Sequence, residues 1–131
     1  WPDTRLQCTV DASCWVRGHL NTLAQALENI LRNAIRHSPS GGVVHLGGRR
    51  DGDYWHLWLE DQGSGVAQED LERMFLPFTR LDGSRPGDGG FGLGLSIARN
   101  AVRRQGGQIW AQNTGTGLQV NMRLLVHASP V

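Results

Sequence analysis

The sequence predicts an α+β two-layer sandwich, in which about three helices cover one face of a mixed, mostly antiparallel sheet of about five strands. Three observations support this prediction. Strand-like and helical segments are mixed along the chain, and neighbouring strands are joined by short turns that are typical of hairpins. The 131 residues suit one domain with one core, and no internal repeat or interdomain linker is visible. Hydrophobic residues make up 39% and charged residues 19%, which is a globular composition.

The first third of the chain contains two short strands and a long helix. Residues 6–10 and 14–16 have strand character on either side of a turn at residues 11–13. Apolar residues then recur at alternating spacings of three and four, which places them on one stripe of a helix. They are Leu20, Leu23, Leu27, Ile30 and Ala34. Ser38-Pro39 and the glycines at 41 and 42 end this helix.

The middle of the chain predicts a hairpin, a short helix and a loop. Residues 43–46 and 54–60 are expected to pair across Asp51-Gly52. The second strand, YWHLWLE, is apolar at both parities, so we expect it to be buried on both faces or half-covered by a ligand. A short acidic helix follows at residues 68–74. The segment 81–89 is rich in Gly, Pro and Asp without periodicity, which predicts a long mobile loop.

The last third predicts a helix and a final hairpin. Residues 93–105 form the helix, which Gly106-Gly107 closes. GQIWAQ and LQVNMRLLV both alternate apolar and polar residues, so we expect them to pair around Asn113-Thr114-Gly115.

Charge, hydropathy and cysteine content limit the class of protein. The net charge of +1 is too balanced to indicate nucleic acid as a partner. No apolar run approaches the ~20 residues of a membrane span, so we expect no direct membrane contact. Two cysteines without a metal-binding spacing are expected to be buried thiols, as in a reducing compartment. The chain begins at Trp1 and is expected to be a piece of a longer protein.

A glycine-rich stretch, GGFGLGL at residues 89–95, leads directly into the last predicted helix. Helix N-termini carry unpaired N–H groups and the positive end of the helix dipole, so they bind anions. Glycines let the backbone approach a phosphate closely. The stretch is neither a P-loop nor the usual dinucleotide fingerprint. It therefore indicates either a phosphate site or a simple turn.

Three further stretches favour a nucleotide site. In ENILRNAIRHS, Asn29, Asn33 and Arg36 lie on one helical stripe, where mid-helix asparagines are unfavourable unless they serve as Mg²⁺ or phosphate ligands. In EDQGSGV, Asp61 ends an apolar strand next to two glycines, where a carboxylate can accept a hydrogen bond from an exocyclic amine. In MFLPFTRLD, two phenylalanines precede the long loop, either as its anchors or as core residues. The simpler alternatives are a solvated helix face and an ordinary tight turn.

Together and in this order, these four stretches resemble the N, G1, F and G2 boxes of the ATP-binding catalytic domain of bacterial sensor histidine kinases. The resemblance covers residues from about Val16 to Leu125 and extends to a wider superfamily with gyrase, the heat-shock chaperone ATPases and the mismatch-repair ATPases. It implies a Bergerat-type sandwich that binds ATP and Mg²⁺, with the loop from Leu81 to Gly89 as a mobile ATP lid.

The resemblance also assigns roles to individual residues. Asn33 would ligate Mg²⁺ with help from Asn29, Arg36 and Arg80 would contact phosphate, and Asp61 would bind the adenine amine. The nucleotide would further contact His37, Gly63, Gly65, Val66, Phe78, Gly90, Gly92, Leu93, Gly94, Leu95 and Thr116.

The same resemblance implies partners that the chain itself does not contain. No phosphoacceptor-histidine helix is visible in the sequence, so the acceptor and dimerisation domain is expected elsewhere in the parent protein. Through that parent the chain would act on a response regulator. The isolated domain is expected to be a monomer in the cytoplasm, and the parent an inner-membrane receptor.

Two other functions stay open. The first is ATP hydrolysis of the gyrase or chaperone type, in which a Glu four residues before the metal-binding Asn activates water. Here that position is Asn29, and an amide is not a general base. Glu28 lies about 100° around the helix and should not face the same point. The same argument disfavours an anti-sigma serine kinase. The second is a degenerate interaction module without nucleotide.

Overall fold

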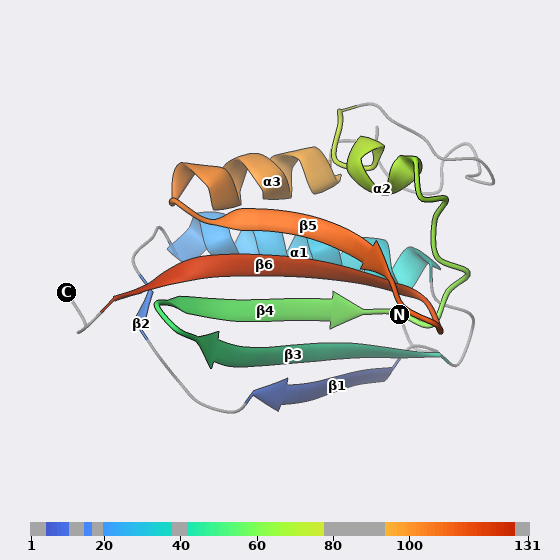
Figure 1. Cartoon of the computed structure of the whole chain (residues 1–131), viewed down its shortest axis with the longest axis horizontal. Coiled ribbons are helices and arrows are strands. Elements are labelled where there is room, and N and C mark those ends of the chain that lie inside the picture. Colours follow the sequence, from blue (N-terminus) through green and yellow to red (C-terminus); the bar gives the residue numbers. More distant parts are fainter. Residues whose placement is uncertain (1–4, 11–14, 17–19, 38–41, 78–93, 128–131) are drawn as a thin grey trace.

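Two long helices lie side by side on one face of a six-stranded sheet in the computed structural model (Figure 1). The structure describes residues 5–10, 15–16, 20–37, 42–77 and 94–127. The elements are, in chain order, β1 (Arg5–Val10), β2 (Trp15–Val16), α1 (Leu20–His37), β3 (Val43–Asp51), β4 (Tyr54–Glu60), α2 (Asp70–Arg73), α3 (Gly94–Arg104), β5 (Gln108–Asn113) and β6 (Leu118–His127). This arrangement confirms the predicted α+β two-layer sandwich.

The sheet is mixed and mostly antiparallel, as predicted, and the described residues contribute six strands to it where about five were predicted. The strand order is β1-β3-β4-β6-β2, and β5 also pairs with β6. Only the β1–β3 pair, among the described strands, is parallel. The two N-terminal strands do not pair with each other, although the sequence places them on either side of a turn. With two residues, β2 offers few ladder hydrogen bonds, whereas β3 pairs with β1 over six positions.

Strand β3 is longer than the sequence predicts. The sequence predicts an end at Leu46, directly before Gly47-Gly48, but the strand continues to Asp51. The reason lies in the partner strand, because the Trp58 ring of β4 occupies the space where a side chain at position 47 would be. The glycine therefore accommodates a large neighbour and does not break the strand.

The helices follow the predicted pattern with small changes at their ends. In α1 the residues Ala26, Ile30 and Ala34 are buried, and Leu23 and Leu27 pack against the core. The acidic helix is shorter than predicted and covers only residues 70–73, whereas α3 ends at Arg104, one residue before the predicted end. The predicted start of this helix at residue 93 lies outside the described residues. No helix in the described part of the chain is both long and apolar enough to cross a membrane.

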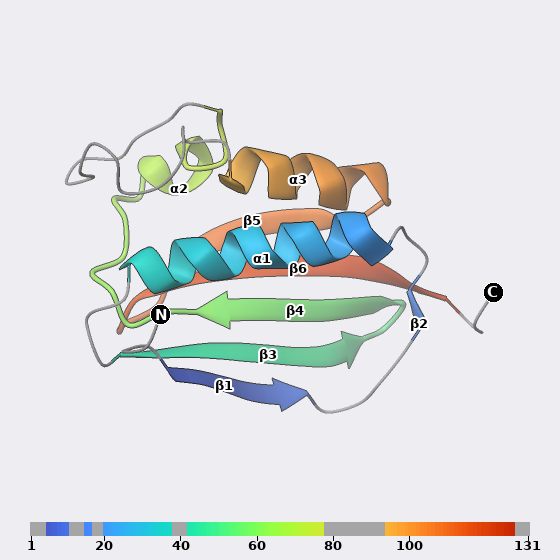
Figure 2. The same ribbon diagram turned by 180° about the vertical axis from the view of Figure 1, so that it is seen from behind.

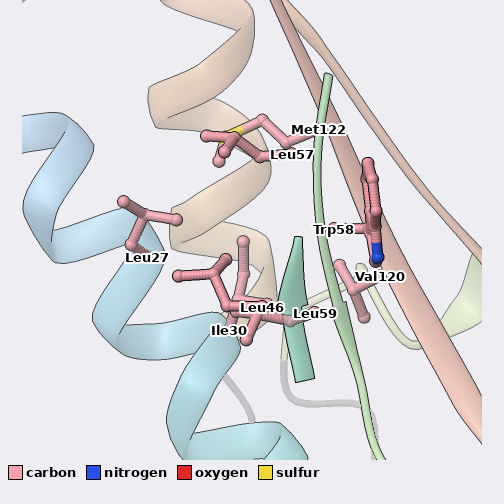
Figure 3. A pocket seen from close by; sticks show the side chains of 8 residues that line it. All are labelled: Leu27, Ile30, Leu46, Leu57, Trp58, Leu59, Val120 and Met122. Carbon is pink, nitrogen blue, oxygen red and sulfur yellow. The ribbon is translucent and has the colours of Figure 1, made fainter. Parts of the chain in front are cut away.

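The core lies between α1, α3 and the inner face of the sheet. Figure 3 shows a small cavity in this core, with Leu27 and Ile30 of α1 facing Leu46 of β3 and Leu57 and Leu59 of β4. Its volume is about 10 Å³, which is about the space of one water molecule, and its lining is apolar. This cavity is a packing gap, and the side chains that line it are apolar apart from the indole N–H of Trp58.

The face of the sheet without helices is covered by its own aromatic side chains. On this face the His56 ring stacks on Trp110 at 5.5 Å and meets Trp58 at 5.2 Å. Beneath them Asn121 is 1% exposed, and its Oδ1 lies 2.8 Å from His56 Nε2. The double apolar parity of YWHLWLE therefore has a structural explanation: one parity enters the helix-covered core, and the other forms this aromatic layer.

Candidate functional site at one end of the sandwich

The predicted site elements gather at one end of the sandwich. Strand β4 ends there (Figures 1 and 2). The C-terminal half of α1, the start of α3 and the turn between β5 and β6 lie at the same end. Chain order does not bring these segments together. The hairpin topology does, because β4 and β5 run in the same direction on either side of β6.

Asp61 follows directly after β4 and is 2% exposed. Its Oδ1 accepts hydrogen bonds from the main-chain N–H groups of Gly63, at 2.9 Å, and Leu118, at 3.2 Å. The Asp61 N–H in turn donates to the Leu118 carbonyl at 2.9 Å. A buried carboxylate normally needs such partners, and here both of these bonds involve the same oxygen. The other oxygen, Oδ2, takes part in neither bond, so it is suited to accept from a ligand.

The turn between β5 and β6 lies against Asp61. A Cβ atom at Gly117 would overlap the main-chain carbonyl of Asp61, so the two backbones are in direct contact. In this turn the residue that is hydrogen-bonded to the Asp61 carboxylate is Leu118, which is 2% exposed. Thr116, the predicted contact in this turn, is exposed, and its N–H lies 3.3 Å from Thr114 Oγ1.

Replacing Gly117 with Ala is expected to destabilise the domain by about 2–4 kcal/mol, because the new methyl group meets main chain that cannot rotate away. Urea denaturation of both proteins measures this difference as a shift in the unfolding midpoint. Gly115→Ala is the matched control, since a Cβ at this position has nothing within 4 Å. Equal midpoints for the two variants would contradict the close contact between Gly117 and Asp61.

Asn29 and Asn33 form a stripe of amide side chains on α1, called here the amide stripe, which lies next to the start of α3. A Cβ placed on Gly94 would be 3.9 Å from the Cβ of Asn29, so the N box and the G2 box meet at this point. Asn33 is half-buried, and its Nδ2 is buried without a hydrogen-bond partner among the described residues. Such an orphaned donor is unfavourable in a native protein unless a ligand or water satisfies it. Arg36, one turn further along, is exposed.

Glu28 points away from this site, as the helical angle predicts. Its carboxylate forms an ion pair with Arg32 at 2.7 Å, and both side chains are more than half exposed. Asn29, by contrast, is half-buried beside α3. The only acidic side chain adjacent to Asn29 in sequence is therefore engaged on the solvent side of α1.

The segments before and after the predicted lid are joined by side chains. Arg99 of α3 forms an ion pair with Glu72 of α2 at 2.7 Å, and its guanidinium lies 5.9 Å from the centre of the Phe75 ring. Phe75 is 2% exposed, which supports its interpretation as a core residue. At the start of α3, Gly94 is exposed and Leu95 is buried in the core.

Several predicted site residues lie outside the described part of the chain. These are Phe78, Arg80, Gly90, Gly92 and Leu93, together with the predicted lid from Leu81 to Gly89. The backbone of His37 ends α1, but its side chain is not described. Their roles remain predictions.

Three residues that contact Asp61 or Val66 have no functional role predicted from the sequence. Gly117 and Leu118 contact Asp61, and Asn113 forms hydrogen bonds to both main-chain groups of Val66. In sequence they resemble ordinary hairpin residues. The sequence signal that was available is Gly117 at the start of the last strand, because a glycine in a strand can mark a close approach of another backbone.

The residues present fit a magnesium nucleotide. Mg²⁺ takes oxygen ligands and keeps several waters and substrate phosphates, so it needs only one or two protein groups. Asn33 offers an amide oxygen for such an ion, and its orphaned Nδ2 is a donor for a phosphate oxygen. The first turn of α3 beside Asn29 offers main-chain N–H groups and the positive end of a helix dipole.

The two-layer sandwich, with the buried Asp61 and the Asn29 and Asn33 amides at one end, is the arrangement expected of an ATP-binding domain. Residues 18–128 match the model of the histidine kinase-, DNA gyrase B- and HSP90-like ATPases, and the chain belongs to this family. The sequence is 56% identical over 124 residues to the sensor protein PfeS of Pseudomonas aeruginosa, covering 95% of this chain. The resemblance to sensor histidine kinases is thereby confirmed. The chain spans only 27% of the length of PfeS.

Two solved structures have the same fold. The mycobacterial sensor histidine kinase MprB superimposes with a TM-score of 0.83 at 29% identity, covering 96% of this chain and 84% of that structure. Full-length ShkA in complex with AMPPNP has a TM-score of 0.80 at 25% identity, covering 98% of this chain and 27% of that structure.

Proposed function

We propose that this chain binds Mg-ATP and supplies the γ-phosphoryl group to a histidine on a separate dimerisation domain, in two-component signal transduction. The observation that carries this proposal is the buried Asp61, whose Oδ1 is held by two main-chain N–H groups at the same end of the sandwich as the Asn33 amide. Membership in the ATPase family and the structural likeness to ShkA in complex with AMPPNP support it.

The proposed roles divide the pocket into a base side and a phosphate side. On the base side Asp61 accepts a hydrogen bond from the adenine amine, and Gly63, Gly65, Val66 and Thr116 surround the ring. On the phosphate side Asn33 and Asn29 hold the metal and the triphosphate, and Arg36 contributes positive charge. The remaining proposed contacts are His37, Phe78, Arg80, Gly90, Gly92, Leu93, Gly94 and Leu95.

The arrangement favours phosphoryl transfer over hydrolysis. A bound Mg²⁺ would offset negative charge on the β- and γ-phosphates. Asn29 does not take a proton from water, and the neighbouring Glu28 is engaged with Arg32. A histidine acceptor needs less activation, since imidazole is itself a nucleophile near neutral pH. The chain's own contribution is therefore to orient the triphosphate and to leave the attacking group to its partner.

The partners and location follow from the same proposal. The acceptor histidine belongs to a dimerisation domain of the parent protein, and a response regulator receives the phosphoryl group from that histidine. The similarity of this chain to a sensor protein and to a sensor histidine kinase supports the proposal. We place the domain in the cytoplasm, as a monomer when isolated, with a parent anchored in the inner membrane.

Calorimetric titration with AMPPNP, combined with a phosphate-release assay on ATP, tests the proposal. We expect binding that strengthens when Mg²⁺ is added, and phosphate release that does not exceed the rate without protein. A separate dimerisation domain should become phosphorylated on histidine when Mg-ATP and this chain are both present. Steady phosphate release would instead indicate a hydrolase, and no binding at all would indicate an interaction module without nucleotide.

A further inference from the structure

The side chain of Asn113 joins two segments of the base side that are 47 residues apart in sequence. Its Oδ1 accepts a hydrogen bond from the Val66 N–H at 3.0 Å, and its Nδ2 donates to the Val66 carbonyl at 2.6 Å. Both halves of the amide are thus used on the main chain of one residue. The side chain acts toward Val66 as a neighbouring strand would.

Gly65 shows how closely Asn113 approaches the loop. This glycine has a φ of +77°, and a Cβ atom at this position would lie 2.6 Å from Asn113 Oδ1. A side chain at position 65 is therefore excluded by backbone conformation and by the amide itself. The Gly65 backbone and the Asn113 side chain are therefore in close contact.

The segment from Asp61 to Val66 is consequently held near both of its ends. At the first end the Asp61 carboxylate accepts from the Gly63 N–H, and at the second end Asn113 holds Val66. Between them the chain has two glycines, at positions 63 and 65, and little conformational restraint of its own.

We infer that Asn113 is a positioning residue for base recognition. Its two hydrogen bonds to Val66 hold the Asp61–Val66 segment in position beside the carboxylate that receives the adenine amine. This inference rests on the proposed ATP-binding function. Asn113 touches neither the base nor the reacting phosphate in this account. It acts through Val66, and its loss allows the Asp61–Val66 segment to move away from the base.

A test must separate this role from a simple contribution to hairpin stability. Gln112, the neighbour of Asn113 on β5, provides the matched control, because its Nε2 donates to Gln119 Oε1 across the same hairpin at 2.6 Å. Gln112→Ala removes a hydrogen bond from the hairpin without touching Val66. The 131-residue chain is used for all variants.

The readout is the ratio of the dissociation constants for ITP and ATP, measured by calorimetry with Mg²⁺. ITP lacks the exocyclic amine, so this ratio reports the contact at Asp61 and is insensitive to a uniform loss of stability. Asn113→Ala is expected to weaken ATP binding about three- to tenfold, the range of one neutral hydrogen bond, and to lower the ratio by a similar factor. Asn113→Asp keeps the side-chain volume and one acceptor but loses the donor, and it should change the ratio in the same direction.

The Gln112→Ala variant should keep the wild-type ratio. A wild-type ratio in both Asn113 variants would overturn the inference, as would an equal fall in the ratio for Gln112→Ala. If the wild-type chain discriminates between ATP and ITP while the Asn113 variants do so equally well, ATP binding stands and only this inference fails. A wild-type chain that binds neither nucleotide would overturn the proposed function and this inference with it.

Discussion

Asp61→Asn is expected to weaken ATP binding by about 100-fold or more while leaving the domain folded. The two main-chain donors, Gly63 and Leu118, both bind Oδ1, and an asparagine oxygen can still accept a hydrogen bond from each of them. The second oxygen then becomes an NH₂ group, which faces the amine of adenine donor against donor. In the bound state this donor lacks an acceptor and opposes the adenine amine, which disfavours binding.

Calorimetry with ATP and urea denaturation together measure the two halves of this expectation. The unfolding free energy should change by less than about 1 kcal/mol, since the hydrogen bonds within the protein are retained. Asp53→Asn is the matched control, because it makes the same chemical change at an exposed position in the β3–β4 turn. Unchanged affinity in Asp61→Asn would remove Asp61 from the base side.

Asn33→Asp is expected to weaken Mg-AMPPNP binding about ten- to hundredfold, which corresponds to about 1.4–2.7 kcal/mol. The substitution keeps an oxygen ligand for the metal. It removes the Nδ2 donor, however, which is buried without a partner in the described part of the chain, and it places a negative charge beside the triphosphate. Repulsion between the carboxylate and the phosphates should outweigh the retained oxygen.

Asn100→Asp serves as the control for this variant, because it introduces the same charge at an exposed position of α3. Titration with AMPPNP at several Mg²⁺ concentrations shows whether the loss depends on the metal. Affinity equal to that of the wild type would contradict the placement of Asn33 on the phosphate side. Wild-type affinity in both Asn33→Asp and Asp61→Asn would overturn the whole site assignment.

Much of the site was predictable because its residues belong to local patterns. The three- and four-residue spacing of apolar side chains defines one face of α1, and this alone places Asn29 and Asn33 together on another part of the helix. Asp61 directly follows the strand pattern YWHLWLE, which is recognisable as a short run of aromatic and aliphatic residues at both parities. A helical period and a strand period are properties of short segments, so no tertiary information is needed to recognise them.

The pairing of the strands, and the contacts of Gly117, Leu118 and Asn113 around the candidate site, were not predictable in this way. Strand β1 pairs with β3 and β2 with β6, although the sequence places both strands beside one turn. Strand β3 runs through two glycines because Trp58 covers the first of them from the neighbouring strand. In each case the deciding contact comes from a residue that is distant in sequence.

The sequence by itself determined the class of fold, the amide stripe of α1, the position of Asp61 and the family. Tertiary structure alone decided that Leu118 faces Asp61, that Gly117 lies against the Asp61 backbone, and that Asn113 holds Val66. The physical reason is that these contacts depend on the register between β4, β5 and β6. Register is set when distant strands pair side by side. The local sequence of a hairpin turn does not determine which other segment of the chain packs against that turn.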